Sequence, residues 1–209
     1  MENILYLYSL PYDPAYPLLC FDERPCVLHG QVVEPLVMQP GKAMRYDYEY
    51  KRNGTCCLLV AVEPLTGFRL VEVSQQRTQA DYTRFMQRLA AHYGQAKQIR
   101  LVQDNLNTHQ AGSFYSTLAA EEAFALAQRF EYHYTPKKGS WLNMAELEIN
   151  AIVRQCLGRR IESQQRMAEE VGELVKERNE KQVTINWQFT PTLARQKLAR
   201  HYEDVRSKN

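Results

Sequence analysis

Three acidic residues, far apart in the sequence, have the type and position needed for metal-dependent chemistry. Asp22 follows the short apolar run 18–21, and Asp104 follows the run 99–103. A carboxylate that ends a strand lies at the rim of a sheet, where rigid backbone holds it and solvent can reach it. Glu146 lies in the first turn of an expected helix. Carboxylate oxygens are the ligands that Mg²⁺ prefers.

Such a set of acids suits phosphodiester cleavage without a covalent intermediate. This reaction benefits from two divalent cations about 4 Å apart, one activating the attacking water or hydroxyl and the other stabilising the leaving oxygen. Magnesium keeps several of its waters, so a few converging carboxylates are enough to hold it. We therefore predict a site for two Mg²⁺ ions, with Mn²⁺ as a substitute.

Each acid also has an ordinary interpretation. Asp22 in Asp-Glu-Arg-Pro and Asp104 before Asn105 could simply begin turns, a common use of aspartate. Glu146 could be present because a glutamate in the first helical turn is favoured by the helix dipole. We favour a shared site, because a single fold can bring the two strand ends and the helix start that carry these acids side by side.

Two neighbouring acids compete for the same roles. Glu23 should point to the opposite side of its strand from Asp22. Glu148 lies about 200° around the helix from Glu146, so the two cannot face one site together. We choose Glu146 because it is nearer the helix start, and the periodicity leaves the choice open.

The composition is that of a globular protein. The chain has 209 residues, 44% of them hydrophobic and 24% charged, which allows one buried core with an additional subdomain. A net charge of +2 permits nucleic-acid binding without arguing for it. Five cysteines without a C-x-x-C pair make a disulfide framework unexpected. No apolar run can span a bilayer and no secretory signal is evident, so we expect a cytoplasmic protein without membrane contact.

The order of elements indicates an α/β fold. Antiparallel strands come first, and helices alternating with strands follow. We expect a mixed five-stranded sheet flanked by helices, with extra C-terminal helices, as in the ribonuclease H-like fold. The predicted strands are 18–22, 46–51, 56–63, 68–74, 99–103 and 131–134, and the predicted helices are 79–93, 119–130, 143–156, 161–179 and 190–202.

These elements predict three segments. Residues 1–16 form a helix end and linker, residues 17–160 the catalytic domain, and residues 161–209 a helical extension. Within the catalytic domain we expect an irregular insert at about 23–45. The alternating tyrosines Tyr46, Tyr48 and Tyr50 are predicted to pack a sheet face on the core, with stacking on bases as the alternative.

Two motifs resemble a known family. Leu101 to His109 (LVQDNLNTH) and Tyr132 to Glu146 (YHYTPKKGSWLNMAE) are similar to the catalytic domain of mariner-like transposases, and more closely to the bacterial insertion-sequence-630 branch of the DDE superfamily endonucleases. The similarity extends from Pro11 to Tyr202. It implies that Asp22, Asp104 and Glu146 are the D-D-E triad, although Met144 replaces the family's proline.

The resemblance also implies an activity and partners. We expect magnesium-dependent hydrolysis of double-stranded DNA at transposon ends and joining of the freed 3′-hydroxyl to target DNA, usually at TA. A homodimer is implied. The helix-turn-helix region that precedes this domain in the family is missing, so we expect a separate DNA-binding polypeptide or a truncated remnant. The alternatives are a catalytically silent interaction module and another ribonuclease H-like nuclease.

Further polar residues surround the acids in the sequence. Five basic residues are candidates for binding DNA phosphates, although a solvated basic face is the alternative: Lys137, Lys138, Arg154, Arg159 and Arg160. Asn105, His109 and Asn143 are candidate supporting residues. His109 could orient a ligand or contact the scissile phosphate, or be an ordinary structural histidine. Asn143 is also predicted to cap the helix that carries Glu146.

Overall fold

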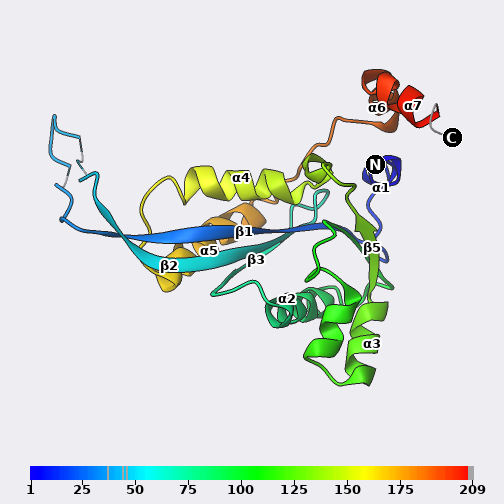
Figure 1. The fold of residues 1–209 in the computed structure, drawn as a ribbon, viewed down its shortest axis with the longest axis horizontal. Coiled ribbons are helices and arrows are strands. Elements are labelled where there is room, and N and C mark those ends of the chain that lie inside the picture. Colours follow the sequence, from blue (N-terminus) through cyan, green and yellow to red (C-terminus); the bar gives the residue numbers. More distant parts are fainter. Residues whose placement is uncertain (37, 44, 46, 207–209) are drawn as a thin grey trace.

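The sheet has five strands in the order β3-β2-β1-β4-β5 (Figure 1). The computed structural model describes residues 1–36, 38–43, 45 and 47–206, except the side chains of 201 and 204–206. Strands β1 (Leu18–Gln31), β2 (Tyr50–Val62) and β3 (Arg69–Ser74) pair antiparallel, whereas β4 (Ile99–Gln103) and β5 (Phe130–Tyr134) run parallel to β1. The predicted mixed five-stranded, ribonuclease H-like sheet is confirmed.

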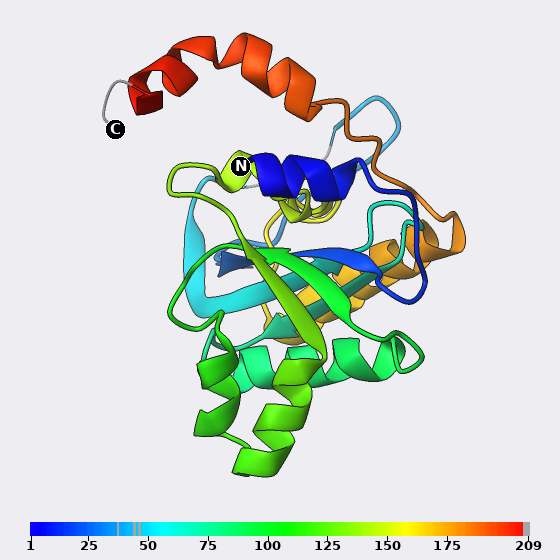
Figure 2. The ribbon, with the colours of Figure 1, turned by 90° about the vertical axis from the view of Figure 1, so that its right-hand side faces the viewer.

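Helices cover both faces of the sheet and extend past its end (Figures 1 and 2). Helices α2 (Gln79–His92) and α3 (Ala120–Gln128) cover one face, and α4 (Ala145–Gln155) and α5 (Gln164–Glu180) cover the other. The short 3-10 turns η1 (Ala111–Ser116) and η2 (Ser140–Leu142) precede α3 and α4. Helices α1 (Glu2–Tyr8), α6 (Pro191–Lys197) and α7 (Ala199–Arg206) lie together near the chain ends.

Alternation along the strands divides the core into two layers. Leu19 and Phe21 of β1 are buried against the α2 side, whereas Cys26 and Leu28 are buried against α4 and α5. Successive strand residues point to opposite faces, so Asp22 is on the α4 side and Glu23 on the α2 side. All five cysteines are free and buried.

Strand β1 is much longer than predicted. The segment after Asp22 was expected to be irregular, yet β1 continues to Gln31 and pairs with β2, with one irregularity at Leu28 and His29. Pro25 lies inside this strand, opposite Cys57. Proline is tolerated there because no strand in the described part of the chain pairs with the other side of β1 beyond Cys20, and an edge strand can lack a hydrogen-bond donor.

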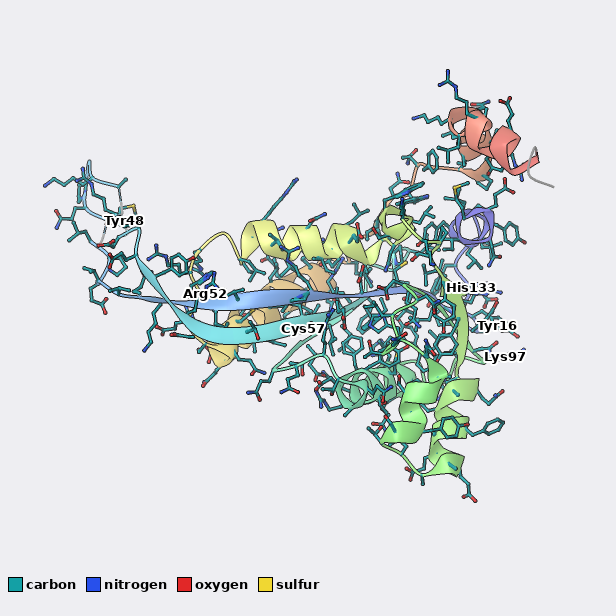
Figure 3. All side chains as sticks on the ribbon, in the orientation of Figure 1. Tyr16, Tyr48, Arg52, Cys57, Lys97 and His133 are labelled. Carbon is teal, nitrogen blue, oxygen red and sulfur yellow. The ribbon has the colours of Figure 1, made fainter. Side chains whose placement is uncertain are left out.

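The β1–β2 hairpin projects from the body of the molecule as an arm (Figures 1 and 3). The prediction that its tyrosines pack on the core is wrong, because Tyr48 is 86% and Tyr50 47% exposed. Tyr46 lies outside the described residues. No helix in the described part of the chain is both long and apolar enough to cross a membrane.

Candidate active site

Asp22 lies at the point where β4 ends beside β1. The parallel pairing of these strands joins Leu18–Cys20 to Arg100–Val102, and β1 then continues alone on that side. The rim that exposes Asp22 therefore exists because β4 stops, whereas the prediction had β1 itself stop there. Asp22 stays within a continuous strand, held on its other side by pairing with Val60 of β2. Its backbone position is correspondingly rigid.

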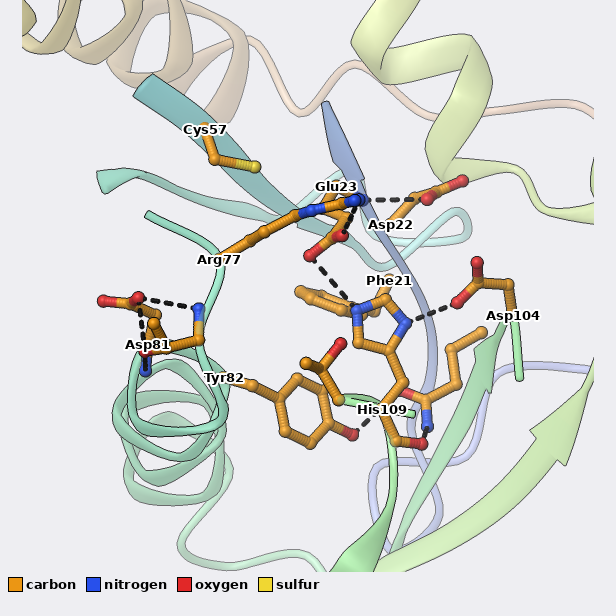
Figure 4. A network of polar contacts seen from close by, with 12 residues as sticks. Phe21, Asp22, Glu23, Cys57, Arg77, Asp81, Tyr82, Asp104 and His109 are labelled. Carbon is orange, nitrogen blue, oxygen red and sulfur yellow. Dashed lines mark hydrogen bonds and ion pairs between the residues drawn. The ribbon is translucent and has the colours of Figure 1, made fainter. Parts of the chain in front are cut away.

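Asp104 is the first residue after β4 and is oriented by a buried histidine (Figure 4). His109 is 0% exposed, and its Nδ1 contacts Oδ1 of Asp104. The Nε2 atom of the same ring lies 3.3 Å from Oε2 of Glu23. Burial lowers the pKa of His109, but the two carboxylates outweigh it and raise this pKa to about 9. At neutral pH the ring is therefore protonated and donates to both acids.

Three further residues hold the histidine. Gln103 donates from Nε2 to the carbonyl of His109 at 2.8 Å and accepts from the Tyr82 hydroxyl at 2.9 Å. On the other side, Arg77 donates to Oε1 of Glu23 at 2.9 Å (Figure 4). The Asp104–His109 contact is thus the inner part of a network that is anchored to α2 and β1.

Asn143 connects β1 to the start of α4. It is 1% exposed, and its Nδ2 donates to the carbonyl of Phe21 at 2.7 Å and to Oδ2 of Asp22 at 3.3 Å. Its Oδ1 accepts from the amide of Ala145 at 3.2 Å. The N-cap of α4 is Met144, so the predicted cap lies one residue early. The contacts of Asn143 nevertheless fix the helix start against the strand that carries Asp22.

Glu146 and Glu148 occupy different environments. Glu146 is partly exposed and lines a surface hollow together with Asp22. Glu148 is fully buried, and its carboxylate pairs with Arg69 at 3.0 Å and with Arg178 at 2.8 Å. The geometry therefore favours Glu146 as the third acid, because the oxygens of Glu148 are already used within the protein.

The charges of Asp104 and Glu146 both act on the carboxyl group of Asp22. Burial raises the pKa of Asp22, the Glu23 amide lowers it, and the charges of Asp104 and Glu146 raise it further, to about 6. Among the described residues, no three or more His, Cys, Asp or Glu side chains already surround a common point as metal ligands. The donor chemistry still fits a hard divalent cation, since all three groups are carboxylates whose mutual repulsion a cation would relieve.

The predicted DNA-binding residues lie in different surroundings. Lys137 and Lys138 are exposed in the loop before η2, and Arg154 is exposed at the end of α4. Arg159 pairs with Glu170 at 2.7 Å. Arg160 instead donates to the carbonyls of Asp47 and Glu49 in the arm, at 2.6 and 2.7 Å. The candidate supporting residue Asn105 is exposed beside Asp104.

Two residues near the acids were missed as site residues from the sequence. Arg77 reaches Glu23 from a distant segment, and no sequence pattern links the two. Arg24 lines the same hollow as Asp22 and Glu146. The alternation of β1 would have placed Arg24 beside Asp22, had the strand been expected to continue.

Comparison with known proteins finds similar solved structures and a matching family model. Among solved structures, the Mos1 mariner paired end complex with Mn is 14% identical, with a TM-score of 0.47, over 87% of this chain and 60% of that chain. The HTLV-2 integrase catalytic core domain in complex with magnesium (dimeric form) is 14% identical, with a TM-score of 0.39, over 81% of this chain and 83% of that chain. This chain thus spans about 60% of the Mos1 chain.

No curated protein matches the sequence. The family model described as DDE superfamily endonuclease matches residues 17–168, which is more than half of the chain and includes all three acids. The chain therefore belongs to the DDE superfamily endonucleases.

Proposed function

We propose that this chain is the catalytic domain of a transposase that cuts DNA strands at the ends of a mobile element. The observation that supports the proposal is that Asp22 shares a surface hollow with Glu146 and that the charges of Asp104 and Glu146 both act on its carboxyl group. We further propose the insertion-sequence-630 branch as the nearest relatives and TA as the target for joining the freed 3′-hydroxyl.

Asp22, Asp104 and Glu146 would hold the cations, two Mg²⁺ or Mn²⁺ ions. Bound there, such ions supply an activated water or hydroxyl and stabilise the leaving oxygen. The chain's own contribution is to fix the acids. Asn143 holds the Asp22 side chain, and protonated His109 holds that of Asp104.

The proposal includes partners and surroundings. The substrate is double-stranded DNA, at the element's ends and in the target, and the active form is a homodimer. A separate helix-turn-helix polypeptide would recognise the terminal repeats, and the bacterial cytoplasm would be the site of action. Lys137, Lys138 and Arg154 are exposed and available for phosphates of this DNA.

A nicking assay tests the function. The purified chain is incubated with supercoiled plasmid and Mg²⁺ or Mn²⁺, and Asp104→Asn is compared with Asp13→Asn, a change at an exposed aspartate outside the site. We expect the chain and Asp13→Asn to nick DNA, and Asp104→Asn to lose nicking while binding Mn²⁺ more weakly in calorimetry. Equal nicking by Asp104→Asn would refute the mechanism. A chain that binds Mn²⁺ yet never nicks would favour the catalytically silent module.

A further inference from the structure

Among the described residues, no strand pairs with the α4 side of β1 beyond Cys20, and only at His29 does its backbone amide donate to the carbonyl of Ile161 there. The pairing of β1 with β4 ends at Cys20, whereas its pairing with β2 continues to Gln31. Helix α4 runs alongside this stretch (Figure 1). Two surface hollows lie between the strand and the helix, and they share Arg24 and Pro25. Together they form one groove, here called the β1–α4 groove, lined by Asp22, Arg24, Pro25 and His29 of β1 and by Glu146, Asn150 and Val153 of α4.

The groove begins at the acids and leads along β1 toward the arm. Asp22 and Glu146 line one end, and His29 lines the other. His29 follows Asp22 by seven positions along the strand, which corresponds to about 23 Å at the usual strand rise. Duplex DNA rises 3.4 Å per base pair, so this length matches about seven base pairs. The groove is therefore long enough for a DNA backbone segment that starts at the acids.

Arg24 is the cation nearest the acids in this groove. It lies two residues after Asp22 on the same face of β1, about 7 Å along the strand. Its side chain is exposed, and within the part of the chain that the structure describes it forms no ion pair. By contrast, Arg159, which also lines the groove, pairs with Glu170. The guanidinium of Arg24 is thus free to bind an anion.

The helix adds polar groups along the same side. Glu146, Asn150 and Arg154 follow one another at four-residue intervals on α4 and therefore form one stripe. Asn150 and Arg154 are exposed, whereas Ile149 and Ile152 face the core. An amide and a guanidinium are donors that commonly contact DNA phosphates.

We propose that the β1–α4 groove seats the sugar-phosphate backbone of the DNA next to the cleaved bond, with Arg24 as a positioning residue that binds a phosphate beside the scissile one. The inference rests on the proposed function for the chemistry at the acids. A DNA backbone fits the acids and Arg24 together, because one phosphate can reach the cations held by the acids while its neighbour pairs with Arg24. An acidic polypeptide, whose only charged groups are carboxylates, would be repelled by Asp22 and Glu146.

Binding without divalent metal tests the groove separately from cleavage. Fluorescence anisotropy with a labelled 20-base-pair duplex, over monovalent salt from 50 to 200 mM, compares the chain with Arg24→Ala, Arg24→Lys and Arg88→Ala. Arg88 is an exposed arginine of α2, on the opposite face of the sheet. We expect Arg24→Ala to weaken binding roughly three- to tenfold and to reduce the log–log salt slope by about 1. Arg24→Lys should keep the slope, and Arg88→Ala should leave both quantities unchanged.

The outcomes separate this inference from the proposed function. Unchanged affinity and slope in Arg24→Ala, or an equal loss in Arg88→Ala, would overturn the role of Arg24. Nicking with Mn²⁺ then provides the second measurement, in which Arg24→Ala should raise KM by a larger factor than it lowers kcat. DNA binding that depends on Arg24 without any nicking would refute the proposed function and support the groove. Nicking with the same KM in Arg24→Ala would support the function and overturn the inference.

Discussion

Glu146 and Glu148 stand two residues apart on α4 and face opposite environments. Glu146 opens onto the hollow that Asp22 also lines, whereas Glu148 is fully buried between Arg69 of β3 and Arg178 of α5. Arg69 is itself buried and donates to the carbonyls of Gly67 and Val183. One turn of helix thus presents an acid to the candidate site and a second acid to the core.

This division predicts opposite effects of two matched substitutions. Glu148→Gln should lower the free energy of unfolding by about 3–5 kcal/mol, because it leaves the buried guanidinium of Arg69 and the partly buried one of Arg178 without their carboxylate. Glu146→Gln should change it by less than about 0.5 kcal/mol, as expected for a partly exposed residue outside the core, and should abolish nicking. Urea unfolding and the plasmid assay measure the two effects. A stable but inactive Glu148→Gln together with an active Glu146→Gln would show that Glu148, and not Glu146, is the third acid of the site.

The same pair shows what the sequence could and could not predict. Helical periodicity separates Glu146 from Glu148 but does not say which one faces the sheet edge. That choice depends on Arg69 and Arg178, which reach Glu148 from β3 and α5. Contacts between distant segments leave no local pattern, so the third acid could be selected only by its nearness to the helix start.

Elements with strong local signals were predicted well. Strand β4 occupies the predicted residues Ile99–Gln103, and α2 begins at the predicted Gln79 because Thr78 caps it. The length of β1 was missed because Asp-Glu-Arg-Pro has turn-like composition, whereas pairing with β2 holds it extended. Because β1 was not expected to continue past Asp22, the position of Arg24 and the groove could not be predicted either.

His109 should act on the metal site through Asp104. His109→Phe keeps an aromatic ring against Phe21 and Tyr82 but removes both donors, so we expect Mn²⁺ affinity and nicking to fall roughly 10- to 100-fold. His109→Asn should recover part of the loss, since its amide can still donate to one carboxylate. Calorimetry with Mn²⁺ measures the affinity and circular dichroism verifies the fold. Mn²⁺ affinity equal to that of the unmodified chain in a folded His109→Phe would show that the ring serves packing alone.

Arg160 should stabilise the arm, although it was predicted to bind DNA. Its guanidinium donates to the carbonyls of Asp47, Tyr48 and Glu49 and to the Gln31 side chain, at 2.6 to 3.1 Å. Arg160→Ala should therefore speed amide hydrogen exchange in residues 47–52 and leave residues 56–62 of β2 protected.

Arg159→Ala is the matched control for this exchange measurement, because it removes an ion pair with Glu170 and no contact to the arm. We expect it to leave exchange in residues 47–52 unchanged. If Arg160→Ala behaved like the control and instead reduced the salt dependence of DNA binding, the predicted phosphate contact would be correct and the arm would be held by other interactions.

Asp81 gives the fold a pH dependence that is separate from the candidate site. It forms a capping box with Thr78 at the start of α2 and also accepts from Ser74 and Arg84. Burial alone would raise the pKa of Asp81, but these hydrogen bonds outweigh it and lower the pKa to about 2, from an ordinary value of 3.8. The folded state therefore favours the charged form.

A lowered folded-state pKa stabilises the protein above the unfolded-state pKa, and the contribution is lost as the pH falls from about 4 toward 2. Asp81→Asn should thus cost about 1–2 kcal/mol of unfolding free energy at pH 7, and this difference should shrink as the pH approaches 2. Urea unfolding across this range measures it, with Glu173→Gln, an exposed change on α5, as the control. A cost for Asp81→Asn that stayed constant between pH 7 and pH 2 would mean that the side chain acts by shape and packing, and that its charge contributes nothing to the helix start.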